Sequence, residues 1–167
     1  MVQRRDGSLF VRHCETVRTD AGDDIETRLA HIWQRLQSVV REYHPQVMGY
    51  EDQQGAQVGG WRQGQYNGHN SLVNLTVGIA VGCALAYGLE VLRLTPAQAK
   101  IALLGKGSRS AKKNRIKDAV ERLYQLRGEK APRMSHHAAD AVAIAMGAER
   151  LWSTQKLVAE AMRGRKA

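Results

Sequence analysis

Between residues 24 and 43, apolar side chains recur every three or four positions, which is the period of an amphipathic helix. The stripe consists of Ile25, Leu29, Ile32, Leu36, Val39 and Tyr43. Asp23, followed three residues later by Glu26, has the spacing of a capping box at a helix start. Pro45 prevents the helix from continuing. The pattern therefore predicts a helix over Asp24–Tyr43.

A second helix is predicted over Leu72–Tyr87, where apolar residues occupy almost every face and Gly88 stands at a C-cap position. A helix of this composition must be covered on every side, either by the core of its own domain or by a partner subunit. Gln, Gly and Asn dominate residues 53–70, which precede it, so we expect a long polar loop there. Long loops inside compact domains are usually functional or mobile.

Three further helices follow in the second half of the chain. Pro96 opens a short helix over Ala97–Leu104. Ser110–Leu126 is amphipathic, with Ile116, Val120 and Leu123 facing inward and its lysines outward. Ser135 is the expected N-cap of the last helix. Its packing stripe is Ala139, Val142, Ala143, Ile144 and Met146, and the chain is expected to end in a frayed basic tail over 163–167.

Shorter apolar runs predict strands between these helices. They are Ser8–Arg18, Val47–Tyr50 and Glu90–Leu94, with Val2–Arg4 as the end of a preceding strand. Strands that alternate with helices indicate an α/β domain with a partly parallel sheet. We expect residues 1–167 to form one such domain.

Composition excludes several classes of protein. The chain has 167 residues, of which 43% are hydrophobic, so it is long and apolar enough for a folded core. Its N-terminus lacks the apolar run of a signal peptide, and Leu72–Tyr87 is too short to span a bilayer. Cys14 and Cys83 fit no metal-ligand or redox spacing, so both are interpreted as reduced core thiols. These features predict an intracellular protein that does not enter membranes.

Positive charge is concentrated in the second part of the chain. The net charge is +9 overall, and it divides into −2 over residues 1–52 and +11 over residues 53–167. Residues 100–117 include no acidic residue and seven basic ones: Lys100, Lys106, Arg109, Lys112, Lys113, Arg115 and Lys117. Such clustering is typical of a nucleic-acid surface, and the Gly105–Ser108 loop within it would allow close approach to phosphates. The alternative is a solvated basic face without a ligand.

Three side chains are candidates for chemistry. Glu51 ends a predicted strand, where the functional crevice of an open α/β sheet lies. His137 and Asp140 are three residues apart at the start of the last helix and therefore share a face. Each also has an ordinary interpretation. Glu51 could be a loop carboxylate, His137 a surface histidine, and Asp140 an acid that favours the helix dipole. Together, two carboxylates and an imidazole would suit Mg²⁺ or Mn²⁺.

Four segments, in the order that they have in the family, resemble the RuvC family of Holliday-junction resolvases, which belongs to the RNase H-like superfamily. They are Tyr50–Glu51, Ala99–Lys100 with Gly105–Gly107, Ala111–Lys113, and Ser135–Ala145 around Asp140. The resemblance extends from about Val2 to Trp152. It implies an RNase H-like mixed sheet flanked by helices. The polar loop after Glu51 is longer than is usual in the family.

The resemblance also implies functional roles. Glu51, His137 and Asp140 would be metal-binding catalytic residues, and Lys113 and Lys100 would lie near the scissile phosphate. The expected activity is Mg²⁺-dependent nicking of four-way DNA junctions by a homodimer joined through the Leu72–Tyr87 helix. A branch-migration helicase is an expected partner. Such an enzyme would work in the cytoplasm of a bacterium or be encoded by a phage.

One departure from the family concerns the N-terminus. The family begins with a strand that ends in a catalytic Asp, and this chain starts where the second family strand would finish. We therefore expect an incomplete N-terminal strand pair and interpret the chain as a truncated form whose upstream codons encode the missing strand. Two alternatives remain: a RuvC-like protein that binds junctions without cutting them, and a basic module that binds RNA or a helicase.

Overall fold

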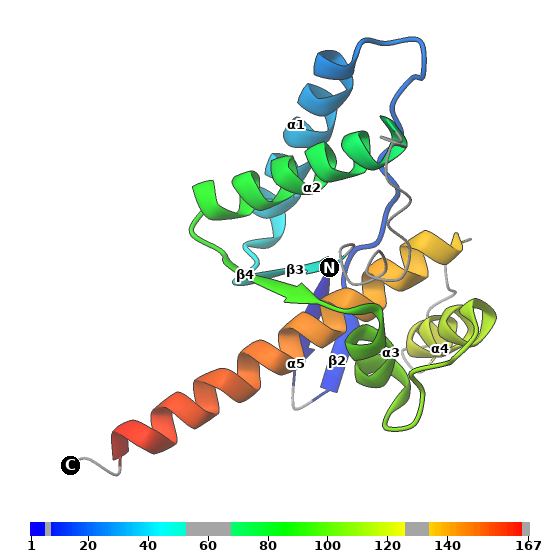
Figure 1. Cartoon of the computed structure of the whole chain (residues 1–167). Coiled ribbons are helices and arrows are strands. Elements are labelled where there is room, and N and C mark those ends of the chain that lie inside the picture. Colours follow the sequence, from blue (N-terminus) through cyan, green and yellow to red (C-terminus); the bar gives the residue numbers. More distant parts are fainter. Residues whose placement is uncertain (6–7, 53–67, 126–133, 165–167) are drawn as a thin grey trace, which may run out of the picture. The chain divides into compact units, whose positions relative to one another are not determined.

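The computed structural model describes residues 1–5, 8–52, 68–125 and 134–164 (Figure 1). Their contacts divide the chain into two compact units, which are described separately. The first unit comprises Met1–Glu15, Gly49–Asp52 and Leu92–Ala167, and the second comprises Thr16–Met48 and Gln53–Val91. All the candidate site residues named above belong to the first unit.

The second unit contains two long helices that pack against each other, α1 (Ile25–Tyr43) and α2 (Gly68–Ala86). The predicted first helix is confirmed, but its N-cap is Asp24 and not Asp23. The Asp24 side chain accepts a 2.7 Å hydrogen bond from the Thr27 backbone N–H. The shift arises because Asp24 is the last residue with extended backbone before the helix begins.

Helix α2 starts at Gly68, four residues earlier than predicted. The last three positions of the predicted loop are thus helical, while positions 53–67 lie outside the described residues. The helix ends before Gly88, whose φ of 71° confirms the expected glycine at this boundary. Leu75 is 45% exposed and Leu85 61% exposed, so the described residues do not cover every face of α2.

The first unit begins with an antiparallel hairpin, β1 (Val2–Arg5) and β2 (Ser8–Val11), in which Val2 is opposite Val11. The predicted strand Ser8–Arg18 is therefore too long. The ladder with β1 ends at the pair Val2–Val11, and beside this pair the Arg12 N–H donates a 2.9 Å bond to the Met1 carbonyl.

Strands β3 (Val47–Glu51) and β4 (Glu90–Leu94) pair with each other and lie where the sequence predicts strands. Glu90 N–H donates to Gln46 O just before β3, and Asp52 N–H donates to Leu94 O just after it. The start of β3 is thus bonded to the start of β4, and the end of β3 to the end of β4, as in a parallel pair. One antiparallel and one parallel pair agree with the predicted mixed α/β fold.

Three helices complete the first unit: α3 (Pro96–Leu104), α4 (Lys113–Gln125) and α5 (His136–Gly164). Thr95 and Gln98 form a capping box before α3, and the Ser135 hydroxyl accepts the Ala138 N–H at 3.1 Å, as predicted for the start of α5. Helix α4 starts at Lys113 and not at Ser110, because the preceding residues form a turn in which Ala111 N–H bonds to Ser108 O.

The core of this unit is built from small and aliphatic side chains on α4 and α5. Ile116 and Val120 of α4 are buried as predicted, and Leu123 packs beside them. Of the predicted α5 stripe, Ala139, Val142, Ala143 and Met146 are buried, and Ile144 is partly buried. The predicted frayed tail is wrong at Arg163 and Gly164, which are helical, and residues 165–167 lie outside the described part. Within the described ranges, no helix is suited to crossing a membrane.

Candidate active site and nucleic-acid interface

Two glycines allow β3 and β4 to lie directly on α5. A Cβ atom on Gly49 would come within 2.6 Å of the Ala148 Cβ and 3.2 Å of the Ile144 Cγ2. A Cβ atom on Gly147 would come within 2.5 Å of the Leu94 Cδ2. The 2.6 Å approach to the Ala148 Cβ is closer than real Cβ atoms come, so position 49 requires glycine, whereas a Cβ at position 147 would require the Leu94 side chain to shift.

This crossing places the candidate acidic residues on facing surfaces. Ile144 and Ala148 form the stripe of α5 that meets Gly49. Asp140 lies one turn before Ile144, and His137 lies seven residues before it, so both continue the same stripe. Glu51 is two residues after Gly49 and therefore shares its face of β3. From this spacing we expect all three predicted residues to lie on surfaces that face the contact between β3 and α5.

The acidic pair at the end of β3 has two different environments. Asp52 accepts a 2.6 Å hydrogen bond from the Arg93 guanidinium, and this bond raises the pKa of Arg93. Glu51 and Asp140 are half-buried, and His137 is exposed. Within the described ranges, no side chain bonds to any of these three. Asp52 is therefore occupied by a structural ion pair, which supports the choice of Glu51 as the functional residue.

The donor chemistry at this contact suits a hard divalent cation, since carboxylate oxygens are the ligands that Mg²⁺ prefers. Among the residues that the structure describes, no three His, Cys, Asp or Glu side chains are close enough together to hold a metal ion. Mg²⁺ commonly uses only one or two protein carboxylates and takes its other ligands from water and substrate phosphates. Two half-buried carboxylates without a partner in the described structure fit that mode of binding.

The predicted basic segment forms an ordered loop between α3 and α4, which we call the basic loop (residues 105–112). Ser108 is only 6% exposed and its hydroxyl donates to the carbonyls of Lys100 and Gly105, at 3.1 Å and 2.5 Å. Gly105 and Gly107 have φ values of 89° and 86°, which only glycine adopts without strain. A buried hydroxyl and two glycines therefore determine the path of the loop.

The cations of this segment lie mostly at the surface. Lys100 is half-buried, and Lys117 is 3.8 Å from Glu121 in an ion pair one helical turn away. The other five are exposed, and none has an ion-pair partner among the described residues: Lys106, Arg109, Lys112, Lys113 and Arg115. This arrangement leaves five charges available to a polyanion. Lys113 is the first residue of α4 and directly follows the basic loop.

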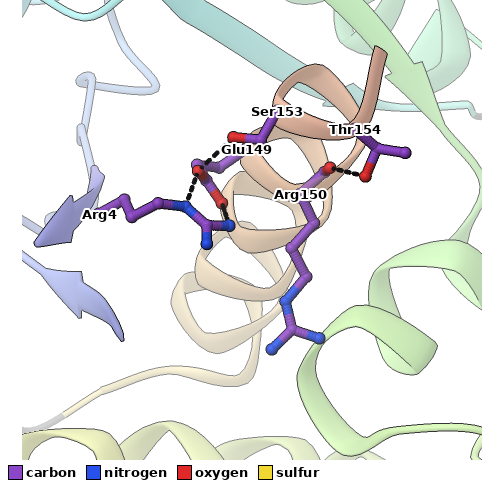
Figure 2. A network of polar contacts seen from close by, with 5 residues as sticks. All are labelled: Arg4, Glu149, Arg150, Ser153 and Thr154. Atoms are coloured by element: carbon purple, nitrogen blue, oxygen red, sulfur yellow. Dashed lines mark hydrogen bonds and ion pairs between the residues drawn. The ribbon is translucent and has the colours of Figure 1, made fainter. Parts of the chain in front are cut away.

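The structure also contains a polar network that sequence reasoning missed. Arg4 of β1 forms two hydrogen bonds with the Glu149 carboxylate of α5, at 2.6 Å and 2.8 Å, and Ser153 adds a third at 2.7 Å (Figure 2). Burial raises the pKa of Glu149, but these bonds outweigh it and lower the pKa overall. The partners are 145 positions apart, so no local pattern in the sequence indicates the pair.

Comparisons with known proteins show the family to which the chain is similar. Residues 1–148 match the family model described as crossover junction endodeoxyribonuclease RuvC. The chain is 32% identical to the crossover junction endodeoxyribonuclease RuvC of Koribacter versatilis, over 80% of this chain and 75% of that protein. It is 30% identical to the protein of the same description from Moorella thermoacetica, over 87% of this chain and 80% of that protein.

Solved structures give the same result for the fold. The structure of Thermus thermophilus RuvC matches with a TM-score of 0.65 and 27% identity, covering 88% of this chain and 81% of that one. The T. thermophilus RuvC in complex with Holliday junction substrate matches with a TM-score of 0.64 and 24% identity, covering 87% and 81%. Because the second structure is only 24% identical to this chain, its similarity supports the fold and nothing further.

Proposed function

This chain belongs to the RuvC family of crossover junction endodeoxyribonucleases, and from this premise we propose that it resolves four-way DNA junctions by hydrolysing phosphodiester bonds. The observation that carries the proposal is the family match over residues 1–148, which includes Glu51, the basic loop and Asp140. The contact of Gly49 on β3 with Ile144 and Ala148 on α5 supports the proposal, because Glu51 and Asp140 each follow the contacting residues at the spacing of one face.

We assign catalysis to this contact. Glu51 and Asp140 would hold Mg²⁺, with Mn²⁺ as a substitute and His137 as a third ligand or a group that orients water. When bound, such a cation lowers the pKa of its water and stabilises charge on the phosphate. Lys113 is exposed at the start of α4 and would stabilise the charge that develops on the phosphate oxygens. The half-burial of Glu51 and Asp140 strengthens their attraction for a cation.

DNA binding is assigned to the cations of the basic loop and its flanking helices. The exposed residues Lys106, Arg109, Lys112 and Arg115 would contact phosphates, and Lys100 and Lys117 would add to the same positive field. These contacts carry no sequence information, so they suit an enzyme that recognises the shape of its substrate.

Three further assignments complete the proposal. The exposed apolar residues of α2 would join two copies of the chain, so that two sites cut opposite strands of one junction. A branch-migration helicase would be a functional partner on the same DNA. The place of action would be the bacterial cytoplasm, including that of a phage-infected cell.

Cleavage of a synthetic four-way junction in the presence of Mg²⁺ tests the proposal. Asp140→Asn keeps the shape of the side chain but removes its charge, so we expect cleavage to fall at least about 100-fold while junction binding persists. Asp118→Asn, on the exposed surface of α4, is the matched control and should cut like the wild type.

Two results would contradict the proposal. Binding of junctions without nicks by the wild-type chain, with Mg²⁺ or Mn²⁺ present, would indicate a junction-binding protein that does not cut. Equal affinity for a four-way junction and a linear duplex of the same length would remove the structure selectivity.

A further inference from the structure

The β1–β2 hairpin has one face in the core and one face turned away from it. Val11 is 4% exposed and belongs to the core cluster, and Leu9 packs against that cluster. Arg4, directly opposite Leu9, extends from the same face to Glu149 of α5. Since side chains alternate along a strand, the neighbouring residues of both strands lie on the opposite face.

That opposite face gathers four side chains of unusual composition. Gln3 is directly opposite Phe10 in the strand register. Arg5 lies two residues after Gln3, and Arg12 lies two residues after Phe10. These four residues line a hollow of about 440 Å³. We call it the hairpin hollow. It contains the one phenylalanine of the chain, two guanidinium groups and one carboxamide.

We propose that the hairpin hollow binds an unpaired nucleotide of the DNA substrate, with the base stacked on Phe10 and the phosphate held by Arg5 and Arg12. The inference rests on the proposed DNA substrate, but it concerns a surface outside the β3–α5 contact and the basic loop. The hairpin hollow has its own cations and its own aromatic ring, so this binding would not require residues of the proposed nuclease centre.

The chemistry of the four residues favours a nucleotide. An arginine guanidinium binds phosphate through two parallel hydrogen bonds. An aromatic ring beside such cations is the usual platform for an unstacked base, whatever the base is. The Gln3 carboxamide can both donate to and accept from a base edge. A volume of 440 Å³ lies within the range of small-ligand sites.

The basic loop offers a useful contrast. Residues 100–117 contain seven cations and no aromatic residue, so that segment can bind phosphates but has no ring on which a base could stack. The hairpin hollow would therefore add to the DNA-binding affinity a contribution that depends on the presence of bases. An acidic peptide is the competing ligand for two arginines and a ring, and the experiment separates the two.

The probes are a thymidine oligonucleotide of about ten residues, a usual site size for single strands, and an abasic oligonucleotide of the same length and charge. Fluorescence anisotropy measures their affinities for the full chain. We expect the wild type to bind the thymidine probe at least about five-fold more tightly than the abasic probe, as stacking of one base predicts.

Two substitutions at Phe10 form a matched pair. Phe10→Tyr keeps the ring and should preserve the preference for bases, whereas Phe10→Leu keeps an apolar side chain without a ring and should abolish it. Arg12→Gln should weaken the binding of both probes and lower the slope of log K against log salt by about one. Circular dichroism would verify that each variant is folded.

The outcomes separate this inference from the proposed function. If a blunt-ended four-way junction is bound but both oligonucleotides bind equally, the hairpin hollow is not a nucleotide site while the proposed function stands. An equal preference of Phe10→Leu and Phe10→Tyr for the thymidine probe over the abasic probe would also overturn the nucleotide site. Binding of an oligoglutamate peptide that exceeds binding of the thymidine probe would assign the hollow to an acidic protein. Failure to bind the blunt junction would instead contradict the proposed function.

Discussion

At the scale of single residues, charged side chains in this protein divide into those that are occupied by structural partners and those that are not. Arg4 with Glu149 and Arg93 with Asp52 are joined by hydrogen bonds of 2.6 Å. Glu51 and Asp140 bond to no other side chain among the described residues. Unpaired carboxylates that are half-buried cost free energy unless a cation or solvent compensates them, so we expect the second group to be the functional one.

Arg4→Met tests the first group. It leaves Glu149, which is 9% exposed, with Ser153 as its partner. We expect a loss of about 1 kcal/mol in the free energy of unfolding at neutral pH, near the lower end for a broken charged hydrogen bond because the Arg4 side chain is 43% exposed. Urea denaturation followed by circular dichroism measures this loss.

The same pair predicts a pH dependence. Because Arg4 and Ser153 lower the pKa of Glu149 despite its burial, the stabilisation is present above the pKa of an unfolded glutamate, about 4.3. It is lost as the pH falls through the lower folded value. The wild type and Arg4→Met should therefore converge in stability as the pH is lowered toward about 3. A difference that grows on acidification would contradict the assignment.

At the scale of elements, the crossing of β3 and β4 over α5 determines where the candidate site lies. The crossing depends on two glycines. Gly49 on β3 lets the side chains of Ile144 and Ala148 approach the strand backbone, and Gly147 on α5 lets the Leu94 side chain approach the helix backbone. Helix α5 is the common support, since it contacts α3, α4 and β1 as well. A change at the crossing should therefore affect stability and the site together.

Gly49→Ala is the corresponding test. The new methyl group would lie 2.6 Å from the Ala148 Cβ, so we expect a loss of about 1–3 kcal/mol from overpacking. Cleavage should fall as well, because Glu51 is displaced with the strand. Gly164→Ala at the end of α5 is the control: a Cβ there has no atom within 4 Å, and alanine should leave stability unchanged or raise it by up to about 1 kcal/mol. Thermal denaturation and the cleavage rate are the measurements.

The basic loop allows a second test at this scale. Changing Lys112 and Lys113 together to glutamine should weaken junction binding and lower the slope of log K against log salt by about two, one for each lost phosphate contact. Arg163→Gln, which changes an exposed cation near the end of α5, serves as the control. An unchanged slope would mean that Lys112 and Lys113 are only solvated.

At the scale of the whole molecule, symmetric cutting of a junction needs two copies of the site. Leu75 and Leu85 of α2 are 45% and 61% exposed, although the helix is apolar almost all round. Large exposed apolar side chains on such a helix are typical of a surface that another subunit covers. The exposure of these side chains supports the proposed dimerisation through α2.

Leu85→Asp should convert a dimer into a monomer, as measured by light scattering after size exclusion, because it introduces a charge into an apolar contact. Val158→Asp on α5, where Val158 is 51% exposed, is a control of similar exposure and should leave the mass unchanged. A wild-type chain that is monomeric at all concentrations would contradict the proposed interface.

Local patterns in the sequence were sufficient for much of this protein. Periodicity predicted α1, β3, β4 and the start of α5, because each of these depends on spacing and capping within a few residues. The order of charge along the chain predicted the basic loop, since neighbouring residues form it. Position at a strand end and spacing on one helix predicted Glu51, His137 and Asp140 as candidates, and the family resemblance added their roles.

Tertiary structure decided what depends on residues far apart in the chain. The extent of β2 follows from its pairing with β1, and the Arg4–Glu149 pair joins residues that are 145 positions apart. The role of Asp52 as the partner of Arg93, and of Gly49 and Gly147 as contact points, likewise follows only from the fold. Local sequence specifies backbone preference and capping, but register, close approach and ion pairing are determined by which distant surfaces meet.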